Sequence, residues 1–245
     1  MTCIKYLLTI IVLNLFIIGC SNNEINTIPE NDFTNIYKNS QKKLQNGNYK
    51  EAIKLLEILD NQYPFSYVTK QTQLDMIYAY YKLSELPLSM AIIDRFIRLD
   101  TTNENIDYAL YMRGLILETL DHSALKNFFG IDNSDHDPQH AIEAFRNFKQ
   151  LLLFYPNSFY ATDASKHLIF LKERLAKYEL EIIKYYNKRG AYIAVINRIE
   201  QMLINYPDTQ STRIALKYME ISYRKLGLIQ ESNKVLKLIS YNPPY

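Results

Sequence analysis

The sequence is poor in glycine and cysteine, and it has no excess of charge of either sign. Only 6 of its 245 residues are glycine, which argues against a β-sheet protein with many tight turns. Its 28 Lys and Arg residues nearly balance 26 Asp and Glu residues. No basic field therefore exists to attract phosphates, and we expect no nucleic-acid partner.

Cysteine and long apolar runs are confined to the N-terminus. The two cysteines are Cys3 and Cys20, so we expect no disulfide in the rest of the chain, whose fold must rest on packing. The apolar run from Tyr6 to Ile18 has 13 residues. A membrane-spanning helix needs about 20, so this run suits the apolar region of a secretory signal instead.

The signal ends in Ile17-Ile18-Gly19-Cys20, which resembles the lipobox of bacterial lipoproteins. Cleavage before Cys20 makes residues 1–19 a signal peptide, and diacylglyceryl and N-acyl groups would then be attached to Cys20. The alternative is a chance cysteine after an ordinary signal peptide. Ser21 follows where an Asp would favour inner-membrane retention, so we expect lipid anchoring on the periplasmic side of the outer membrane. Residues 20–32 are polar and read as a flexible tether.

From Phe33 onward apolar residues recur at three- and four-residue spacing, which predicts helices. A motif also repeats: glycine, an aromatic residue, a small or β-branched residue, an apolar residue and a closing proline. It occurs without gaps at Gly47-Tyr49-Ala52-Leu56-Pro64 and Gly190-Tyr192-Val195-Ile199-Pro207, and in part at Ala144-Phe148-Pro156 and Gly227-Ser232-Leu236-Pro244. A further unit lies around Pro87, with its register left open.

These repeats resemble the tetratricopeptide repeat. Glycine suits the turn between paired helices, because it adopts positive φ at little cost, and proline stops the second helix. We therefore predict an all-α fold of five tetratricopeptide-like helix pairs stacked into a superhelical solenoid. An ordinary helical bundle is the alternative. Residues 160–190 contain no internal glycine or proline and predict one long helix that joins two halves, with Lys172, Glu173, Lys177 and Glu179 on its solvated face.

The chain also carries a cluster that could suggest a metal site or catalysis: Asp132, Asp135, His136, Asp137 and His140. An EF-hand loop would need glycine where Asp137 stands. A shared zinc would need both histidines on one helix, but Pro138 lies between them. We predict instead that Asp137 is the N-cap of a helix and Pro138 its first residue. No nucleophile motif occurs, so we expect no catalytic residue, no metal and no cofactor.

Several long strings are similar to those of the BamD family of outer-membrane assembly lipoproteins, formerly called competence lipoproteins. They are "SALKNFFGIDNSDHDPQHA" (123–141), "IDRFIRL" (93–99), "FLKERLAKYE" (170–179), "RGAYIAVINRIE" (189–200) and "YPDTQSTRIAL" (206–216). The resemblance runs from the lipobox to about Lys237. It implies a protein without enzyme activity that belongs to the β-barrel assembly machinery and helps to insert barrel proteins into the outer membrane.

The resemblance also implies partners. The C-terminal half, residues 158–245, would bind the periplasmic POTRA domains of the barrel-forming subunit BamA, with Arg189, Arg198 and Asp208 on that side. Another Bam lipoprotein, such as BamC, would lie along the surface. The N-terminal half, residues 33–157, would read the C-terminal signal of unfolded barrel proteins. A scaffold for another envelope machine, such as cell-wall synthesis, and a metal-dependent envelope enzyme are the rival interpretations.

Aromatic side chains are the candidates for the substrate groove, because an aromatic groove can hold aromatic, extended segments. These candidates are Phe65, Tyr67, Tyr78 and Tyr81, although about half of such aromatics would be core residues. On the partner side, Tyr192, Val195, Ile199 and Met202 form an apolar stripe that should face a neighbouring helix. Arg198 lies off that stripe, and we expect it at the solvent edge, paired with Glu200 or Glu181.

Overall fold

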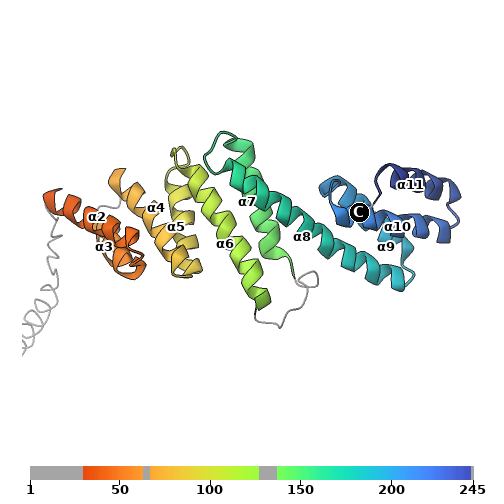
Figure 1. The fold of residues 1–245 in the computed structure, drawn as a ribbon, viewed down its shortest axis with the longest axis horizontal. Helices are drawn as coiled ribbons and strands as arrows, with labels where there is room; N and C mark the ends of the chain where they lie inside the picture. Colours follow the sequence, from red (N-terminus) through yellow and green to blue (C-terminus); the bar gives the residue numbers. More distant parts are fainter. Residues whose placement is uncertain (1–29, 63–66, 127–136, 244–245) are drawn as a thin grey trace, which may run out of the picture. The chain divides into compact units, whose positions relative to one another are not determined.

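The computed structural model describes residues 30–62, 67–126 and 137–243, without the side chains of residues 30–32, 67–68 and 122–126. Within these ranges the regular structure is entirely helical, as Figure 1 shows. The helices are α2 (Glu30–Gln45), α3 (Tyr49–Gln62), α4 (Tyr67–Lys82), α5 (Leu86–Leu99), α6 (Ile106–Lys126), α7 (Gln139–Phe154), α8 (Ala161–Lys188), α9 (Tyr192–Asn205), α10 (Gln210–Lys225) and α11 (Ile229–Tyr241). None of the described helices is both long and apolar enough to cross a membrane.

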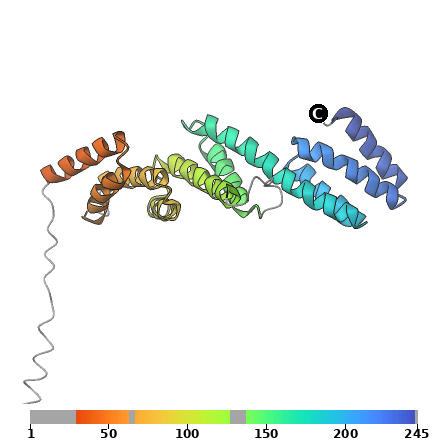
Figure 2. The ribbon, with the colours of Figure 1, turned by 60° about the horizontal axis from the view of Figure 1, so that its bottom comes forward.

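The chain divides into two compact units, Met1–Thr69 and Lys70–Tyr245. In the first, α2 packs against α3. In the second, α6 packs against α7, α8 against α9, and α10 against α11; the α6–α7 and α10–α11 neighbours can be followed in Figures 1 and 2. The predicted all-α fold of consecutive helix pairs is confirmed, and the superhelical course of the whole chain stays a prediction.

The turns within the pairs have one backbone conformation in common. Gly47, Gly190 and Gly227 have φ angles of 75°, 71° and 76°, a region that favours glycine because it has no Cβ. Ser84 takes the same place between α4 and α5, with φ 61°. Five residues later Ser89 is fully buried, and its hydroxyl donates to the carbonyl of Ile77 at 2.9 Å. Ser84 therefore corresponds to the turn glycine, which settles the register of the second repeat.

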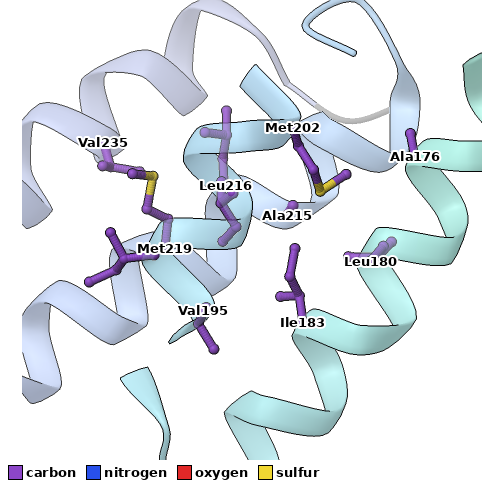
Figure 3. Packing of buried hydrophobic residues seen from close by; sticks show 11 residues of the cluster. Ala176, Leu180, Ile183, Val195, Met202, Ala215, Leu216, Met219 and Val235 are labelled. Carbon is purple, nitrogen blue, oxygen red and sulfur yellow. The ribbon is translucent and has the colours of Figure 1, made fainter. Parts of the chain in front are cut away.

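The long helix predicted for residues 160–190 is confirmed as α8, which has 28 residues. It packs against α7, α9 and α10, so three other helices share one uninterrupted element. Its apolar side joins the core of the C-terminal repeats, which Figure 3 shows from close by. That core comprises Ala176, Leu180, Ile183, Val195, Ile196, Ile199, Met202, Ala215, Leu216, Met219 and Val235.

The predicted stripe on α9 is also confirmed. Val195, Ile199 and Met202 are at most 1% exposed and lie in this core, while Tyr192 is half-buried. In Figure 3, Met202 of α9 points toward Ala215 of α10. The stripe holds α9 between its two neighbours, so α9 turns its other side, which carries Arg198, away from the core.

Candidate functional site

The Asp/His cluster falls largely outside the described residues, because residues 127–136 are not among them. Helix α7 begins at Gln139, with Pro138 as its N-cap. The predicted boundary was therefore wrong by one residue. The Asp137 carboxylate still accepts a hydrogen bond from the backbone N–H of Gln139 at 3.2 Å, because an aspartate side chain can bond the backbone two residues after it. Over the described ranges, no group of three metal-ligating side chains occurs.

Arg198 lies on the outer side of α9 and contacts α8. Its Nη1 donates to Glu179 Oε2 at 2.5 Å, and its guanidinium lies 5.7 Å from the centre of the Tyr186 ring. Partial burial acts to lower the pKa of Arg198, but the bonds and charges of Glu179 and Tyr186 outweigh it and raise that pKa. Arg198 is thus a charged, oriented side chain that is still 36% exposed.

The predicted partners of Arg198, Glu200 and Glu181, were wrong. Glu181 pairs instead with Lys184 at 2.5 Å. Glu200 stands two residues from Arg198 on the same helix, and residues at that spacing do not face each other. The true partner, Glu179, comes from a different helix and lies 19 residues away, so finding it requires the register between α8 and α9.

The other two residues expected on the partner side also contact α8. Arg189 is exposed just after the end of α8, with its guanidinium 4.9 Å from the Tyr185 ring. Asp208 pairs with Lys172, and the hydrogen bond and charge of that lysine lower the pKa of the Asp208 carboxyl. The contacts with α8 run from residue 172 to residue 185, a distance of about 20 Å along the helix. The three residues therefore contact α8 at separate points and do not form a single cluster.

The expectation that the charged residues of α8 form a solvated face was wrong for at least three of them. Lys172 and Glu179 make the ion pairs described above. Glu173 accepts three hydrogen bonds at the start of α10, from the Gln210 N–H at 2.9 Å, the Ser211 N–H at 3.0 Å and the Ser211 hydroxyl at 2.7 Å. Because the first N–H groups of a helix have no partner within it, Glu173 acts as a cap supplied by another helix.

A pocket of about 420 Å³ adjoins the Arg198–Glu179 pair. Its walls come from α8 and α9 and from the tyrosine that follows α9. The lining residues are Glu179, Tyr186, Ala194, Asn197, Arg198, Gln201, Met202, Asn205 and Tyr206. Arg198 was the only one of these predicted as a site residue. The spacing of Asn197, Gln201 and Asn205, four residues apart on α9, is a sequence signal that could have identified these three.

The predicted aromatic groove is described only in part. Tyr78 on α4 is 39% exposed, with the ammonium of Lys82 6.0 Å from its ring centre, and Tyr81 is half-buried. Tyr78 helps to line a hollow of about 220 Å³ together with Tyr108 and Tyr160. Phe65 and the side chain of Tyr67 lie outside the described residues. Two of the four candidates are therefore at least partly accessible.

A polar network between α6 and α8 was not predicted. His167 on α8 contacts Glu118 at 2.6 Å through Nδ1 and Asp163 at 3.2 Å through Nε2. Asp163 also accepts a hydrogen bond from the Tyr111 hydroxyl at 2.7 Å, and the Phe148 ring stacks on His167 at 5.2 Å. Asp163 and His167 are four residues apart on α8, but their partners on α6, Tyr111 and Glu118, lie about 50 residues away in the sequence, so the sequence does not reveal the network.

Comparison with known proteins identifies the family. The family described as "Outer membrane lipoprotein", YfiO, matches residues 29–238. The chain belongs to this family. Among its relatives are the outer membrane protein assembly factors BamD of Vibrio cholerae, 42% identical over 92% of this chain and 93% of the relative, and of Neisseria meningitidis serogroup A, 40% identical over 85% and 78%. BamD of Buchnera aphidicola is 37% identical over 84% of this chain and 85% of the relative.

Membership confirms the resemblance to the BamD family and the outer-membrane lipoprotein location. It also agrees with the prediction of a protein without enzyme activity, because the relatives are named as assembly factors. The rival interpretations, a metal-dependent envelope enzyme and a scaffold for cell-wall synthesis, have no support among these relatives.

Proposed function

We propose that this chain is a non-enzymatic scaffold of the β-barrel assembly machinery, which helps to insert and fold barrel proteins in the outer membrane. The observation that carries the proposal is its membership of a lipoprotein family whose relatives are named as outer membrane protein assembly factors. Stacked helix pairs suit binding rather than chemistry, because their surfaces can hold a partner along several helices.

The C-terminal half, residues 158–245, is the proposed surface for the BamA POTRA domain, with Arg189, Arg198 and Asp208 as contacts. Arg198 is the strongest of these. Glu179 and Tyr186 already orient its guanidinium, so less side-chain entropy is lost when a partner carboxylate approaches. A guanidinium has five N–H donors, and the bond to Glu179 uses one of them, so other donors can make a bidentate contact with a partner carboxylate.

The N-terminal half, residues 33–157, is the proposed reader of unfolded barrel proteins, through Phe65, Tyr67, Tyr78 and Tyr81. The exposure of Tyr78 supports this assignment, since a tyrosine ring offers apolar area together with a polar tip. Lipid on Cys20 would hold the protein at the periplasmic face of the outer membrane, and another Bam lipoprotein such as BamC would bind along the repeats where the organism has one.

The partner surface is tested by replacing one charge. In Arg198→Asp we expect binding of the purified, lipid-free chain to the BamA POTRA domain to weaken at least tenfold. Loss of one partner of a desolvated charge pair costs about 2–5 kcal/mol. The loss should be larger at low salt, where exposed charges are less screened. Calorimetric titration at two salt concentrations measures it, with circular dichroism and the thermal midpoint as checks of the fold.

The matched control is Lys237→Asp, which makes the same charge change at an exposed position of α11. It should bind like the unmodified chain. Unchanged affinity in Arg198→Asp would place the contact elsewhere in the C-terminal half. Loss of the helical signal would make Arg198 a structural residue and remove it from the proposed surface.

A further inference from the structure

Three side-chain amides lie in a row on α9. Asn197, Gln201 and Asn205 are spaced four residues apart, are exposed, and line the same pocket of about 420 Å³. In the part of the chain that the structure describes, none of these three side-chain amides has a hydrogen-bond partner. Each amide can donate through its NH₂ group and accept through its carbonyl. The row therefore presents paired donors and acceptors at regular steps along one wall.

The rest of the pocket supplies apolar surface and no net charge. Ala194 and Met202 of α9 contribute apolar atoms, and the rings of Tyr186 and Tyr206 form parts of the wall. The Tyr206 ring is held edge-on by Phe145, with centroids 6.4 Å apart. The two charged residues, Arg198 and Glu179, neutralise each other. The pocket thus suits a neutral ligand that combines hydrogen-bonding groups with an apolar side chain.

The spacing of the row matches an extended polypeptide. Residues four apart on a helix rise 6.0 Å along its axis, at 1.5 Å per residue. An extended strand repeats every two residues, at about 6.4–6.8 Å, and presents the N–H and C=O groups of alternate residues to one side. Over three amides the mismatch is about 1–2 Å, which rotation about the side-chain bonds can absorb.

We propose that the Asn197–Gln201–Asn205 row binds the main chain of an extended segment of an unfolded barrel protein, with one apolar side chain in the adjoining pocket. The proposal rests on the proposed function for its ligand, and it adds a substrate site in the half assigned to the assembly partner. An unfolded barrel strand has unpaired N–H and C=O groups along its whole length, whereas folded proteins protect their strand edges. Recognition through the main chain also tolerates many sequences, as a factor that serves many barrel proteins requires.

The test uses a ten-residue peptide of alternating valine and threonine, acetylated and amidated so that it carries no charge. We expect the Asn197→Ala, Gln201→Ala, Asn205→Ala triple variant of the mature, lipid-free chain to bind it at least tenfold more weakly than the unmodified chain, as measured by isothermal titration calorimetry. The control Gln230→Ala, Asn233→Ala removes exposed amides from α11 and should bind like the unmodified chain. Circular dichroism confirms that both variants are folded.

A second peptide distinguishes recognition of the main chain from non-specific binding through side chains. Esters replace its amides at three alternate positions, which removes N–H donors and keeps every side chain. The ester peptide should bind the unmodified chain at least tenfold more weakly than the amide peptide does. Its affinity for the triple variant should be only slightly lower than its affinity for the unmodified chain, because the ester peptide already lacks the hydrogen bonds that the triple substitution removes. The proposal is overturned if the ester replacement and the triple substitution weaken binding independently, so that their losses add. It is also overturned if the triple variant binds the amide peptide as tightly as the unmodified chain does, or if the unmodified chain does not bind millimolar peptide.

Binding of the BamA POTRA domain is measured on the same variants. The triple variant should retain it, whereas Arg198→Asp should lose it. If the triple variant loses POTRA binding, the row belongs to the partner surface and the second substrate site is wrong. If peptide binding follows the expected pattern while POTRA binding is absent from the unmodified chain, the assignment of the partner fails and the peptide site stands.

Discussion

At the scale of single residues, Ser84 departs most clearly from the pattern of its repeat. Its φ of 61° is the left-handed conformation that the equivalent positions Gly47, Gly190 and Gly227 adopt at no steric cost. In a residue with a Cβ this conformation costs roughly 1–2 kcal/mol. The strain is local, because Ser84 is exposed and Ser89, not Ser84, carries the buried hydrogen bond of this pair.

We predict that Ser84→Gly stabilises the protein by about 0.5–1 kcal/mol. The gain from relieved strain exceeds the entropy that glycine adds to the unfolded chain. Urea unfolding of the lipid-free chain measures the change, with Gly47→Ala as the reverse substitution, which should destabilise by a similar amount. Lower stability in Ser84→Gly would show that its side chain stabilises the turn in a way that the φ angle does not reveal.

Residue-scale inference from the sequence succeeded where a local rule applies. The turn glycines were predicted because positive φ has a residue preference, and the α9 stripe because burial has a helical period. The partner of Arg198 and the exposure of Tyr78 could not be predicted in this way. Both depend on how neighbouring helices are rotated and shifted against each other, and that arrangement is set by packing across the whole repeat.

At the scale of helices, the free N–H groups at the start of α10 are capped by two residues, one local and one from another helix. Thr209 is the N-cap, and its hydroxyl accepts from the Thr212 N–H at 3.2 Å. Glu173 reaches across from α8 and accepts from Gln210 and Ser211. Local capping was within reach of sequence rules, since threonine is a favoured N-cap. The contribution of Glu173 was not, because nothing near residue 173 identifies α10 as its neighbour.

We predict that Glu173→Ala destabilises the protein by about 2–3 kcal/mol. It leaves three donors without an acceptor at a helix start where Ser211 is buried, and an unsatisfied buried donor costs about 1–3 kcal/mol. Urea unfolding gives the value. Glu231→Ala is the control, because Glu231 makes an exposed pair with Lys234 at 2.8 Å, and such pairs contribute about 0–1 kcal/mol. Equal effects in the two variants would reduce the Glu173 cap to an ordinary surface interaction.

The α6–α8 network predicts how stability depends on pH. The Tyr111 hydrogen bond, with smaller effects from His167 and Lys166, lowers the pKa of the Asp163 carboxyl below its usual value near 3.8. A lowered folded-state pKa stabilises the protein above the unfolded pKa, and this contribution is lost as the pH falls through the folded value. We therefore expect the thermal midpoint to fall below about pH 4, and to fall less steeply in Asp163→Asn.

The measurement is a series of thermal unfolding curves from pH 7 down to pH 2.5. Asp208 has a lowered pKa as well, so a residual slope should remain in Asp163→Asn. Glu104→Gln, an exposed control in the turn before α6, should leave the profile unchanged. A profile of Asp163→Asn that matches the unmodified protein at every pH would show that the Tyr111 bond contributes nothing to folding.

At the scale of the whole molecule, attachment to the membrane is predicted to rest on one residue, the lipidated Cys20. Stable anchoring needs at least two acyl chains, and the lipobox resemblance implies diacylglyceryl and N-acyl groups on Cys20. We predict that Cys20→Ser is released from outer-membrane fractions by urea, which disrupts protein partners, whereas Cys3→Ser stays membrane-bound because residue 3 lies in the segment expected to be removed. Immunoblots of fractionated envelopes measure both. Retention of Cys20→Ser after urea would mean that another segment holds the membrane.

Helix α8 also limits how the length of this chain can change. Lys172, Glu173 and Glu179 contact three different places downstream, at Asp208, Ser211 and Arg198, and no loop lies between them on α8 to absorb an extra residue. One inserted residue would turn everything beyond it by about 100°, so these contacts could not all survive together. Substitutions can alter the contacts one at a time. Insertions and deletions between residues 172 and 179 should therefore be removed by selection.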